Sequence, residues 1–454
     1  MRTRPLSIFA DGLVSRATFG HETIMTRTGL EARLISYRIL DSVLKQKLTL
    51  DDAVARTKGF ADLADRDRAF SRNFVTTTLR RLGQIDAIVA HALERPLTGK
   101  SKPVGHILRL GITQLLFLDT SAHAAVDTSV EMASRLGFTA HKKLVNAVLR
   151  RLAREGRDVI DGQDAERLNT PDWLWSSWCE AYGEDACRRI AKAHLREAPL
   201  DISVKSDTEA WAAKLDATVL PWGTLRRKSG GTVSSLPGFA EGAWWVQDGA
   251  ARLVLALLGD VRGKKVFDLC AAPGGKTAYL ANAGADVVAV DRSEKRLQRL
   301  RENMSRLKLE TTVVHADATE WRPHEKADIV VVDAPCSATG TIRRHPEVAW
   351  LKSPKDIEKL CALQGRLLEA GSAMVKPGGV VLYCTCSLQA EEGPAVIGRA
   401  VDHGAPLVLS HPDPDRLTGE DEYSDANGYF RSFPFHRVAD GGIDGFFAAR
   451  LIRN

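Results

Sequence analysis

A run of small residues in the C-terminal half of the chain has the composition of a ligand-binding turn. It follows a short apolar stretch and reads Asp268-Leu269-Cys270-Ala271-Ala272-Pro273-Gly274-Gly275-Lys276-Thr277. Paired glycines between a strand and a helix let the backbone approach a ligand closely, and the helix start offers free N–H groups. Taken alone, the run is also a near miss to a phosphate-binding P-loop, which needs glycine where Cys270 stands. A P-loop nucleotide hydrolase therefore remains an alternative at this point.

Two acids further along the chain favour a nucleoside cofactor. Asp291 ends the next apolar run, 21 residues beyond Cys270, where an acid hydrogen-bonds the ribose hydroxyls of a bound nucleoside. Asp317 closes the third run and has an oxygen that could accept from an adenine amine. Either acid could instead cap a strand end. Together with Asp268, they suit a neutral or cationic nucleoside better than a triphosphate.

Two thiols follow adjacent apolar runs. Cys336 lies in Asp333-Ala334-Pro335-Cys336, and Cys386 lies in Tyr383-Cys384-Thr385-Cys386-Ser387. A thiolate that adds to C6 of cytosine makes C5 nucleophilic enough to accept a methyl group. That chemistry also needs an acid near N3 and a means of eliminating the adduct, and Asp333 with the second thiol would supply them. Either cysteine alone would as readily be a small core residue, and spacing does not order the two.

The elements that must position these residues are typical of an α/β sheet. From about residue 242, short Val-rich runs alternate with helical stretches. The runs are 265–269, 286–290, 311–315, 328–332 and 380–383. Continuous apolar runs are typical of buried parallel strands, and their alternation with helices predicts a doubly wound sheet. Ligands of such sheets bind beyond the carboxyl ends of the strands, where all the residues named above would lie.

The preceding residues predict two further parts. From Leu30 to about Arg154, apolar residues recur at three- and four-residue spacing, which predicts a bundle of helices. The frequent arginines of this part form either a solvated face or a phosphate-contacting surface. The next part combines an amphipathic helix (173–195) with short strands such as 200–204, as in a small α+β domain. The expected division is a flexible leader 1–28, a helical domain 29–160, an α+β domain 161–241 and an α/β domain 242–454.

Composition excludes several classes of protein. The chain has 454 residues, 44% hydrophobic and 26% charged, with a mean hydropathy of −0.17, so it is neither fibrous nor wholly disordered. No apolar run approaches the ~20 residues that span a bilayer. The seven cysteines form no paired CxxC motif, which argues against a disulfide framework or a structural zinc site. We expect a cytoplasmic monomer without a metal, and the net charge of +6 permits a nucleic-acid partner.

The motifs DLCAAPGGKT, DAPCSATG and TCS, in this order, resemble the RsmB/Nop/Sun family of RNA cytosine-5 methyltransferases. Asp65-Arg66-Asp67-Arg68-Ala69-Phe70 and Val145-Asn146-Ala147-Val148-Leu149-Arg150 are similar to the NusB-like RNA-binding domain that is fused to the bacterial RsmB enzymes. The resemblance implies a Rossmann-like class I methyltransferase domain after an all-α NusB-like bundle and a small α+β domain. It also implies methyl transfer from S-adenosyl-L-methionine to C5 of a cytosine, above all in small-subunit (16S) ribosomal RNA.

The resemblance assigns roles to individual residues. The cofactor would be held by Cys270, Ala271, Ala272, Pro273, Gly274, Gly275 and Lys276. Asp291 would bind the ribose, Asp317 would lie near the adenine, and Asp333 would lie beside the methyl donor and the target base. Cys386 of the TCS motif would be the nucleophile, and Cys336 would act in product release. Cys384 is expected to pack within its strand. Arg343 or Arg344 would contact RNA phosphate, with helix capping as the alternative.

Three other functions remain open. The same chemistry on another RNA, such as tRNA, uses the same residues. A non-catalytic RNA-binding factor of ribosome assembly would retain the fold, although such a copy would be expected to have lost Cys386 or Asp333. A DNA cytosine methyltransferase usually has its nucleophile in a Pro-Cys-Gln context, whereas Ser337 follows Cys336 here.

Overall fold

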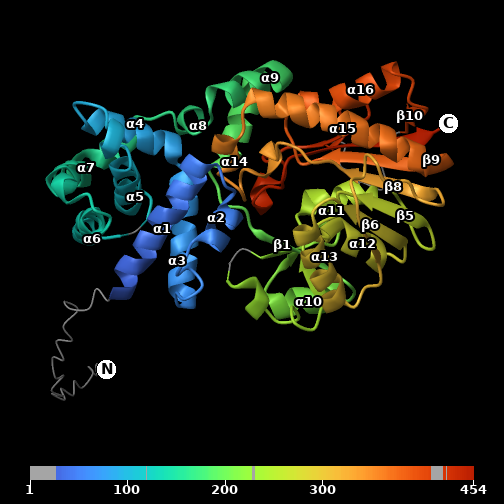
Figure 1. The fold of residues 1–454 in the computed structure, drawn as a ribbon, viewed down its shortest axis with the longest axis horizontal. Coiled ribbons are helices and arrows are strands. Elements are labelled where there is room, and N and C mark those ends of the chain that lie inside the picture. Colours follow the sequence, from blue (N-terminus) through green and yellow to red (C-terminus); the bar gives the residue numbers. More distant parts are fainter. Residues whose placement is uncertain (1–26, 119, 228–230, 411–422, 426) are drawn as a thin grey trace, which may run out of the picture.

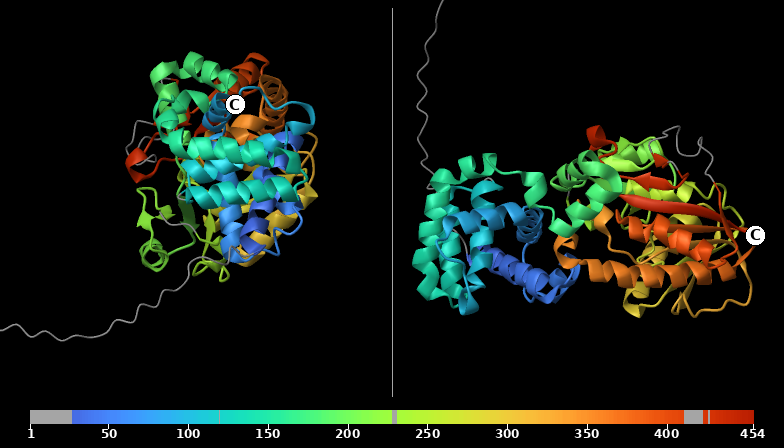
Figure 2. Two further views of the ribbon diagram at one scale, coloured as in Figure 1. Left: turned by 90° about the vertical axis from the view of Figure 1, so that its left-hand side faces the viewer. Right: turned by 90° about the horizontal axis from the view of Figure 1, so that it is seen from above.

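The computed structural model describes residues 27–118, 120–227, 231–410, 423–425 and 427–454. Nearly all of the expected leader, residues 1–28, lies outside this part of the chain. Helices from the first part of the sequence lie at one end of the molecule, and a sheet flanked by helices lies at the other (Figure 1). Seen from above, the two parts lie side by side and are joined through α9, which comprises Asp172–His194 (Figure 2).

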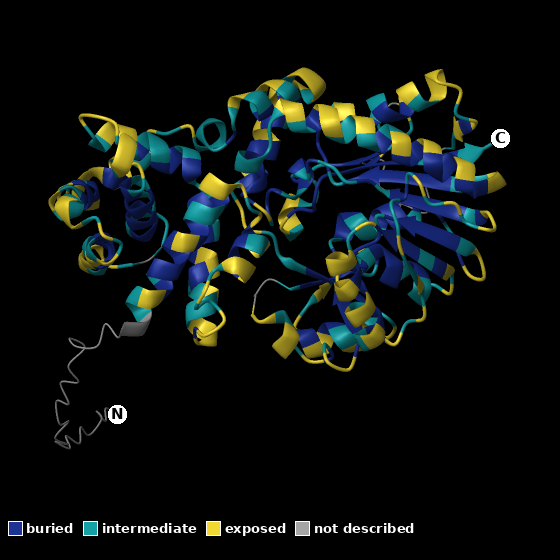
Figure 3. Ribbon diagram, in the orientation of Figure 1, coloured by how far each residue is buried: buried dark blue, intermediate teal, exposed yellow. Residues whose placement is uncertain are grey.

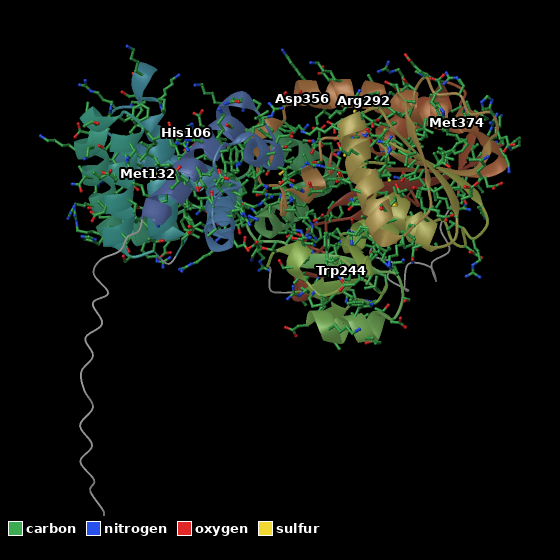
Figure 4. All side chains as sticks on the ribbon, turned by 60° about the horizontal axis from the view of Figure 1, so that its bottom comes forward. His106, Met132, Trp244, Arg292, Asp356 and Met374 are labelled. Atoms are coloured by element: carbon green, nitrogen blue, oxygen red, sulfur yellow. The ribbon has the colours of Figure 1, made fainter. Side chains whose placement is uncertain are left out.

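The N-terminal helices pack around one apolar core. They are α1 (Arg27–Gln46), α2 (Leu50–Arg56), α3 (Asp65–Arg80), α4 (Leu82–Ala92), α5 (Val104–Leu116), α6 (Ala122–Arg135) and α7 (Lys142–Asp161). The predicted apolar stripe of α1 is buried, with Ile35, Ile39 and Val43 fully inaccessible. His106 of α5 and Met132 of α6 point to the inside of this bundle and are labelled in Figure 4. The predicted helical bundle is therefore confirmed.

A small antiparallel sheet follows α8 (Ala165–Leu168) and α9. Its strand order is β2 (Thr218–Val219), β3 (Leu225–Arg227), β1 (Leu200–Val204) and β4 (Trp244–Val246), and α10 (Thr208–Leu215) packs on it. Trp244, labelled in Figure 4, is fully buried in its core. The helix predicted at 173–195 and the strand predicted at 200–204 are confirmed.

The larger sheet contains the five predicted parallel strands. They are β5 (Lys265–Leu269), β6 (Asp286–Asp291), β7 (Thr312–His315), β8 (Ala327–Asp333) and β9 (Val375–Thr385), in the order β7-β6-β5-β8-β9. The order reverses between β5 and β8, where such sheets bind ligands. Beyond β9 the antiparallel strands β12 (Phe446–Arg453) and β10 (Leu407–Leu409) extend the sheet, and β11 (Phe430–Ser432) pairs with β12. These antiparallel strands are absent from the prediction.

Helices cover both faces of this sheet. α11 (Gly249–Ala256), α12 (Gly275–Asn282) and α13 (Glu294–Leu307) pack on one face, and α15 (Pro354–Met374) and α16 (Pro394–Asp402) pack on the other. Figure 3 shows the buried strands between helices whose outer faces are exposed. The predicted Rossmann-like α/β fold is confirmed.

The segment Arg343–Leu351, which includes α14 (Val348–Leu351), joins the two ends of the molecule. The indole of Trp350 packs against the core of the helical bundle and donates to the Leu79 carbonyl at 2.9 Å. Glu347 accepts from the Leu50 N–H at 3.1 Å. The bundle therefore docks on the stretch of chain that follows the Cys336 loop.

Three findings bear on the expected absences. No helix among residues 27–454, leaving out the undescribed positions, is long and apolar enough to cross a membrane. Over the same residues, no group of three or more His, Cys, Asp or Glu side chains is arranged to hold a metal ion. All seven cysteines are free thiols.

Candidate active site

The glycine-containing loop lies at the carboxyl end of β5. Cys270 and Gly274 have left-handed backbone angles, φ 63° and 104°, which turn the chain from β5 into α12. Asp268, at the end of β5, is fully buried and accepts from the Thr277 hydroxyl at 2.6 Å. Its second oxygen has no hydrogen-bond partner within the described part of the chain. Burial raises the pKa of Asp268 to about 7.

Asp291 and Asp317 lie at one small cavity. Asp291 ends β6, is 2% exposed, and accepts from the N–H groups of Ala272 and Ser293 at 3.2 and 2.9 Å. Asp317 lies two residues beyond β7 rather than at its end. Hydrogen bonds from the side chain and backbone of Thr319 lower the pKa of Asp317.

The cavity between these acids is narrow in this conformation. Cys270, Pro335 and Leu367 also line it, and its volume is about 30 Å³. That is room for about two water molecules. A guanidinium nitrogen of Arg296, on α13, lies 3.2 Å from the Asp291 carboxylate, and the same side chain donates to the Ala272 carbonyl. A nucleoside can enter only if Arg296 and neighbouring apolar side chains move.

The two thiols meet at the carboxyl ends of β8 and β9. The sulfur atoms of Cys336 and Cys386 lie 3.4 Å apart, and both side chains are partly exposed. The hydrogen bond to the Cys386 sulfur, followed by burial and the charge of Glu392, raises the pKa of the Cys336 thiol well above its ordinary value. Cys336 is therefore a thiol at neutral pH, and either sulfur can be the donor in the contact between them.

An ion pair lies beside the thiols. The Lys276 ammonium, from the first turn of α12, is 2.8 Å from the Asp333 carboxylate at the end of β8. Burial alone would lower the pKa of Lys276, but Asp333 and the thiols of Cys384 and Cys386 raise it. A permanent cation thus lies where it stabilises a thiolate at Cys386. Cys384 is fully buried in β9, and its predicted packing role agrees with that position.

A buried carboxylate that the sequence analysis missed connects the two thiol loops. Glu392 is fully buried and accepts from the Ser337 N–H at 2.9 Å, the Ser337 hydroxyl at 2.5 Å and the Ser387 hydroxyl at 2.6 Å. Gln364 of α15 donates to it at 3.0 Å. Ser337 follows Cys336 and Ser387 follows Cys386, so Glu392 sets the position of both sulfur atoms. An acidic pair soon after the TCS motif is the only sequence signal for it.

Arg343 and Arg344 belong to a buried ion-pair network. Arg343 is 1% exposed and lies 3.0 Å from Asp444, and Arg344 lies 2.5 Å from Asp248 and 2.9 Å from Asp444. Burial would raise the pKa of Asp248, but the two guanidiniums hold it below its ordinary value. Asp201 of β1 lies 3.8 Å from Arg344, so the network ties the small sheet to the catalytic loops. The RNA contact of these arginines stays a prediction.

Fold and site together define a class of protein. A parallel sheet that reverses between β5 and β8, a glycine loop after its first strand and an acid after its second are the features of a class I, nucleoside-cofactor methyltransferase. Comparison with known proteins narrows this class. Residues 255–452 match the family model for 16S rRNA methyltransferase RsmB/F, and residues 30–154 match the model for the NusB family.

Relatives extend the match over nearly the whole chain. Ribosomal RNA small subunit methyltransferase B of Salmonella arizonae is 32% identical, over 93% of this chain and 98% of its own length. The crystal structure of PH0851 has a TM-score of 0.74 at 22% identity, covering 94% of this chain and 98% of that one. A methyltransferase homologue from Pyrococcus horikoshii has a TM-score of 0.51 at 26% identity, over 63% and 97% of the two chains. The chain belongs to the RsmB/F family of 16S rRNA methyltransferases.

Family membership makes the protein an RNA methyltransferase that uses S-adenosyl-L-methionine, and it excludes the P-loop hydrolase. The residues at the cofactor loop fit this cofactor. The unpaired buried oxygen of Asp268 and the carboxylates of Asp291 and Asp317 favour a ligand that carries positive charge and hydroxyl or amine donors. The free N–H groups at the start of α12 and the ammonium of Lys276 suit the cofactor's own carboxylate.

Proposed function

We propose that this protein methylates C5 of a cytosine in small-subunit (16S) ribosomal RNA through a covalent bond between Cys386 and C6. The observation that carries the proposal is the 3.4 Å approach of the Cys336 and Cys386 sulfurs beside the Lys276–Asp333 ion pair. A methyltransferase that modifies an exocyclic amine or a ribose hydroxyl has no use for paired thiols at the methyl-transfer edge of its sheet.

The proposed reaction starts at Cys386. Its thiol loses a proton, the sulfur bonds to C6, and the electron pair of the C5–C6 double bond moves toward C5. N3 takes up the proton that leaves the Cys386 thiol, and the Asp333 carboxylate holds it there. The hydrogen bond from Cys336 and the charge of Lys276 stabilise the attacking thiolate before the bond forms.

The second half of the reaction removes the adduct. S-Adenosyl-L-methionine supplies the electrophilic methyl group that C5 accepts. Cys336, after its own proton has passed to solvent, takes the C5 proton as a thiolate. The Cys386–C6 bond breaks, the C5–C6 double bond re-forms, and the N3 proton returns to the Cys386 sulfur. Once Cys386 is bonded to C6, its sulfur no longer raises the pKa of Cys336, so the thiolate needed as a base forms more readily.

The proposed substrate is an unstacked cytosine, because C5 and C6 are not accessible to the nucleophile inside a stacked helix. The printed function of the relatives, ribosomal RNA small subunit methyltransferase B, supports 16S rRNA as the target. We place the reaction in the reducing cytoplasm, where both thiols stay free. The division into domains 29–160, 161–241 and 242–454 is part of the same proposal, with the helical domain binding RNA.

Two cysteine variants test this reaction. We expect Cys386→Ala to abolish methyl transfer while cofactor binding survives, and Cys336→Ala to accumulate a protein–RNA adduct that persists in a denaturing gel. The matched control is Cys361→Ala, since Cys361 is a partly buried thiol that donates to the Glu391 carbonyl and lies outside the pair of thiols. Normal turnover in Cys386→Ala, with loss of activity and no adduct in Cys336→Ala, would reverse the two roles. Labelled methyl groups on any atom other than C5 would refute the reaction itself.

A further inference from the structure

A basic pocket with an aromatic wall lies between the end of α9 and the loop that follows β11. Its volume is about 300 Å³. Four of its lining residues are cationic: Arg189, Lys192, Arg196 and Arg343. Its lining residues belong to neither the cofactor cavity nor the pair of thiols.

Cations at the end of α9 and just after it line the pocket. Arg189 and Lys192 are three residues apart and share one face of α9, and Arg196 lies two residues beyond the end of the helix. Lys192 and Arg196 are exposed, and among the described residues neither has an ion-pair partner. Arg189 has only a loose, exposed pair with Asp185 at 3.7 Å. Arg343 is already paired with Asp444, so the unbalanced positive charge is that of the cations at and just beyond the end of α9.

The aromatic wall is a layered stack. The rings of Phe433 and Phe435 are parallel, with centroids 5.1 Å apart, and the Arg189 guanidinium covers Phe435 at 3.9 Å from its ring centroid. The Arg189 side chain is 54% exposed, so part of the planar guanidinium faces solvent. Unpaired RNA bases stack on guanidinium planes of this kind, and phosphates bind the neighbouring cations.

The pocket is tied to the catalytic loops. Tyr182 of α9 packs edge-on against Phe433 and donates to the Leu388 carbonyl at 2.6 Å, two residues beyond Cys386. Arg343 is seven residues from Cys336 along the chain, which limits their Cα separation to about 24 Å. An RNA strand that presents a base to the thiols therefore has its neighbouring nucleotides within reach of the pocket.

We propose that this pocket binds a single-stranded segment of the substrate RNA next to the target cytosine. One base stacks on Arg189, and the flanking phosphates bind Lys192 and Arg196. This inference rests on the proposed function, because it assigns a binding site to the RNA substrate of that reaction.

The test measures RNA affinity directly with the full-length protein and an unmethylated in-vitro transcript of 16S rRNA. We expect Lys192→Ala/Arg196→Ala to weaken binding on the order of 10-fold at physiological salt and to reduce the slope of log K against log salt by about 1.4. Arg189→Lys keeps the positive charge but loses the planar guanidinium, so it should weaken RNA binding without changing the slope of log K against log salt. The KM for cofactor and the thermal midpoint should stay at wild-type values.

The matched control removes two positive charges elsewhere. Arg262→Ala/Lys264→Ala changes two exposed residues just before β5. They lie at the amino end of that strand, whereas the thiols lie at the carboxyl ends of the strands, and their loss should leave RNA affinity unchanged. A single-stranded competitor should displace the transcript better than the same strand annealed to its complement.

Each other outcome has a separate meaning. Equal losses of RNA affinity in the two double variants would show that only the net charge of the protein matters and would overturn the site. Wild-type RNA affinity in Lys192→Ala/Arg196→Ala would also overturn it. Equal competition by duplex RNA would refute the stacking contact. If wild-type protein binds cofactor but methylates no RNA, the proposed function fails, and the binding measurements still decide the pocket.

Discussion

Replacing Glu392 separates the positioning of the thiols from their chemistry. In Glu392→Ala the Ser337 N–H loses its acceptor inside the protein, which costs about 1–3 kcal/mol. The deleted side chain also leaves a cavity, so the total loss of unfolding free energy should be about 3–4 kcal/mol. In Glu392→Gln one oxygen still accepts from Ser337, and the new amide donates to the hydroxyls of Ser337 and Ser387. Only the charge assistance is lost, at about 1 kcal/mol.

The effect on activity follows from the same contacts. Because Glu392 holds the residues after both thiols, its removal lets the sulfur atoms drift, and a displacement of about 1 Å costs about 100-fold in rate. We expect Glu392→Ala to lower kcat by about that factor with the KM for cofactor unchanged. Glu392→Gln should recover most of the rate.

A pH profile distinguishes this role from mere stability. The charge of Glu392 is one cause of the raised pKa of Cys336, so its neutralisation lowers that pKa. When the rate of single-turnover methyl transfer is plotted against pH, the part of the curve that is assigned to ionisation of Cys336 should move to lower pH in Glu392→Gln. Glu391→Gln is the control, because Glu391 is the exposed neighbour on the same turn. An unmoved limb, or equal losses of stability in the Gln and Ala variants by urea unfolding, would refute the reasoning.

Two further predictions concern the cofactor loop. Burial raises the pKa of Asp268 to about 7, so between about pH 4 and pH 7 the folded protein retains a proton that the unfolded chain releases. The stability that Asp268 contributes is complete below pH 4 and is lost as the pH rises through 7. In Asp268→Asn the urea midpoint of unfolding should therefore depend less on pH over that range, and an unchanged pH dependence would contradict this. Arg296→Ala frees the buried Asp291 carboxylate from an ion pair that solvent screens at its half-exposed Arg296 end, which is worth about 1 kcal/mol. Calorimetry should then give up to about fivefold tighter cofactor binding. Weaker binding would show that Arg296 itself holds the cofactor. The control is Arg299→Ala, on the exposed face of α13.

The elements with strong local patterns were predictable from the sequence. The run 265–269 coincides with β5, and the predicted strand 200–204 coincides with β1. β5 has the apolar centre of a buried strand, and β1 alternates apolar residues with Asp201 and Ser203, so the local pattern identifies both strands. The residues at the carboxyl ends of these runs were predictable for the same reason, since parallel strands end at one edge of the sheet.

The C-terminal strands were not predictable in this way. β12 combines Phe446 and Phe447 with two arginines, Arg450 and Arg453, and lies antiparallel between β9 and β10. Its charged residues interrupt the apolar run that marks a buried strand. Long-range pairing, rather than local pattern, determines the position of this strand. Glu392 was not predictable for a similar reason. In the sequence, a buried acid in a turn looks the same as a solvated one, and the hydrogen-bond donors that bury Glu392 come from three separate segments of the chain.

The segment Arg343–Leu351 contains two adjacent arginines for which the sequence predicts an RNA phosphate contact or helix capping. In the structure Arg343 and Arg344 pair with Asp248 and Asp444, and the RNA contact stays a prediction. Burying two guanidiniums is tolerable only because these carboxylates neutralise them. Downstream, Trp350 fixes the same segment to the helical bundle. A segment held from both sides couples the position of the bundle to that of the Cys336 loop.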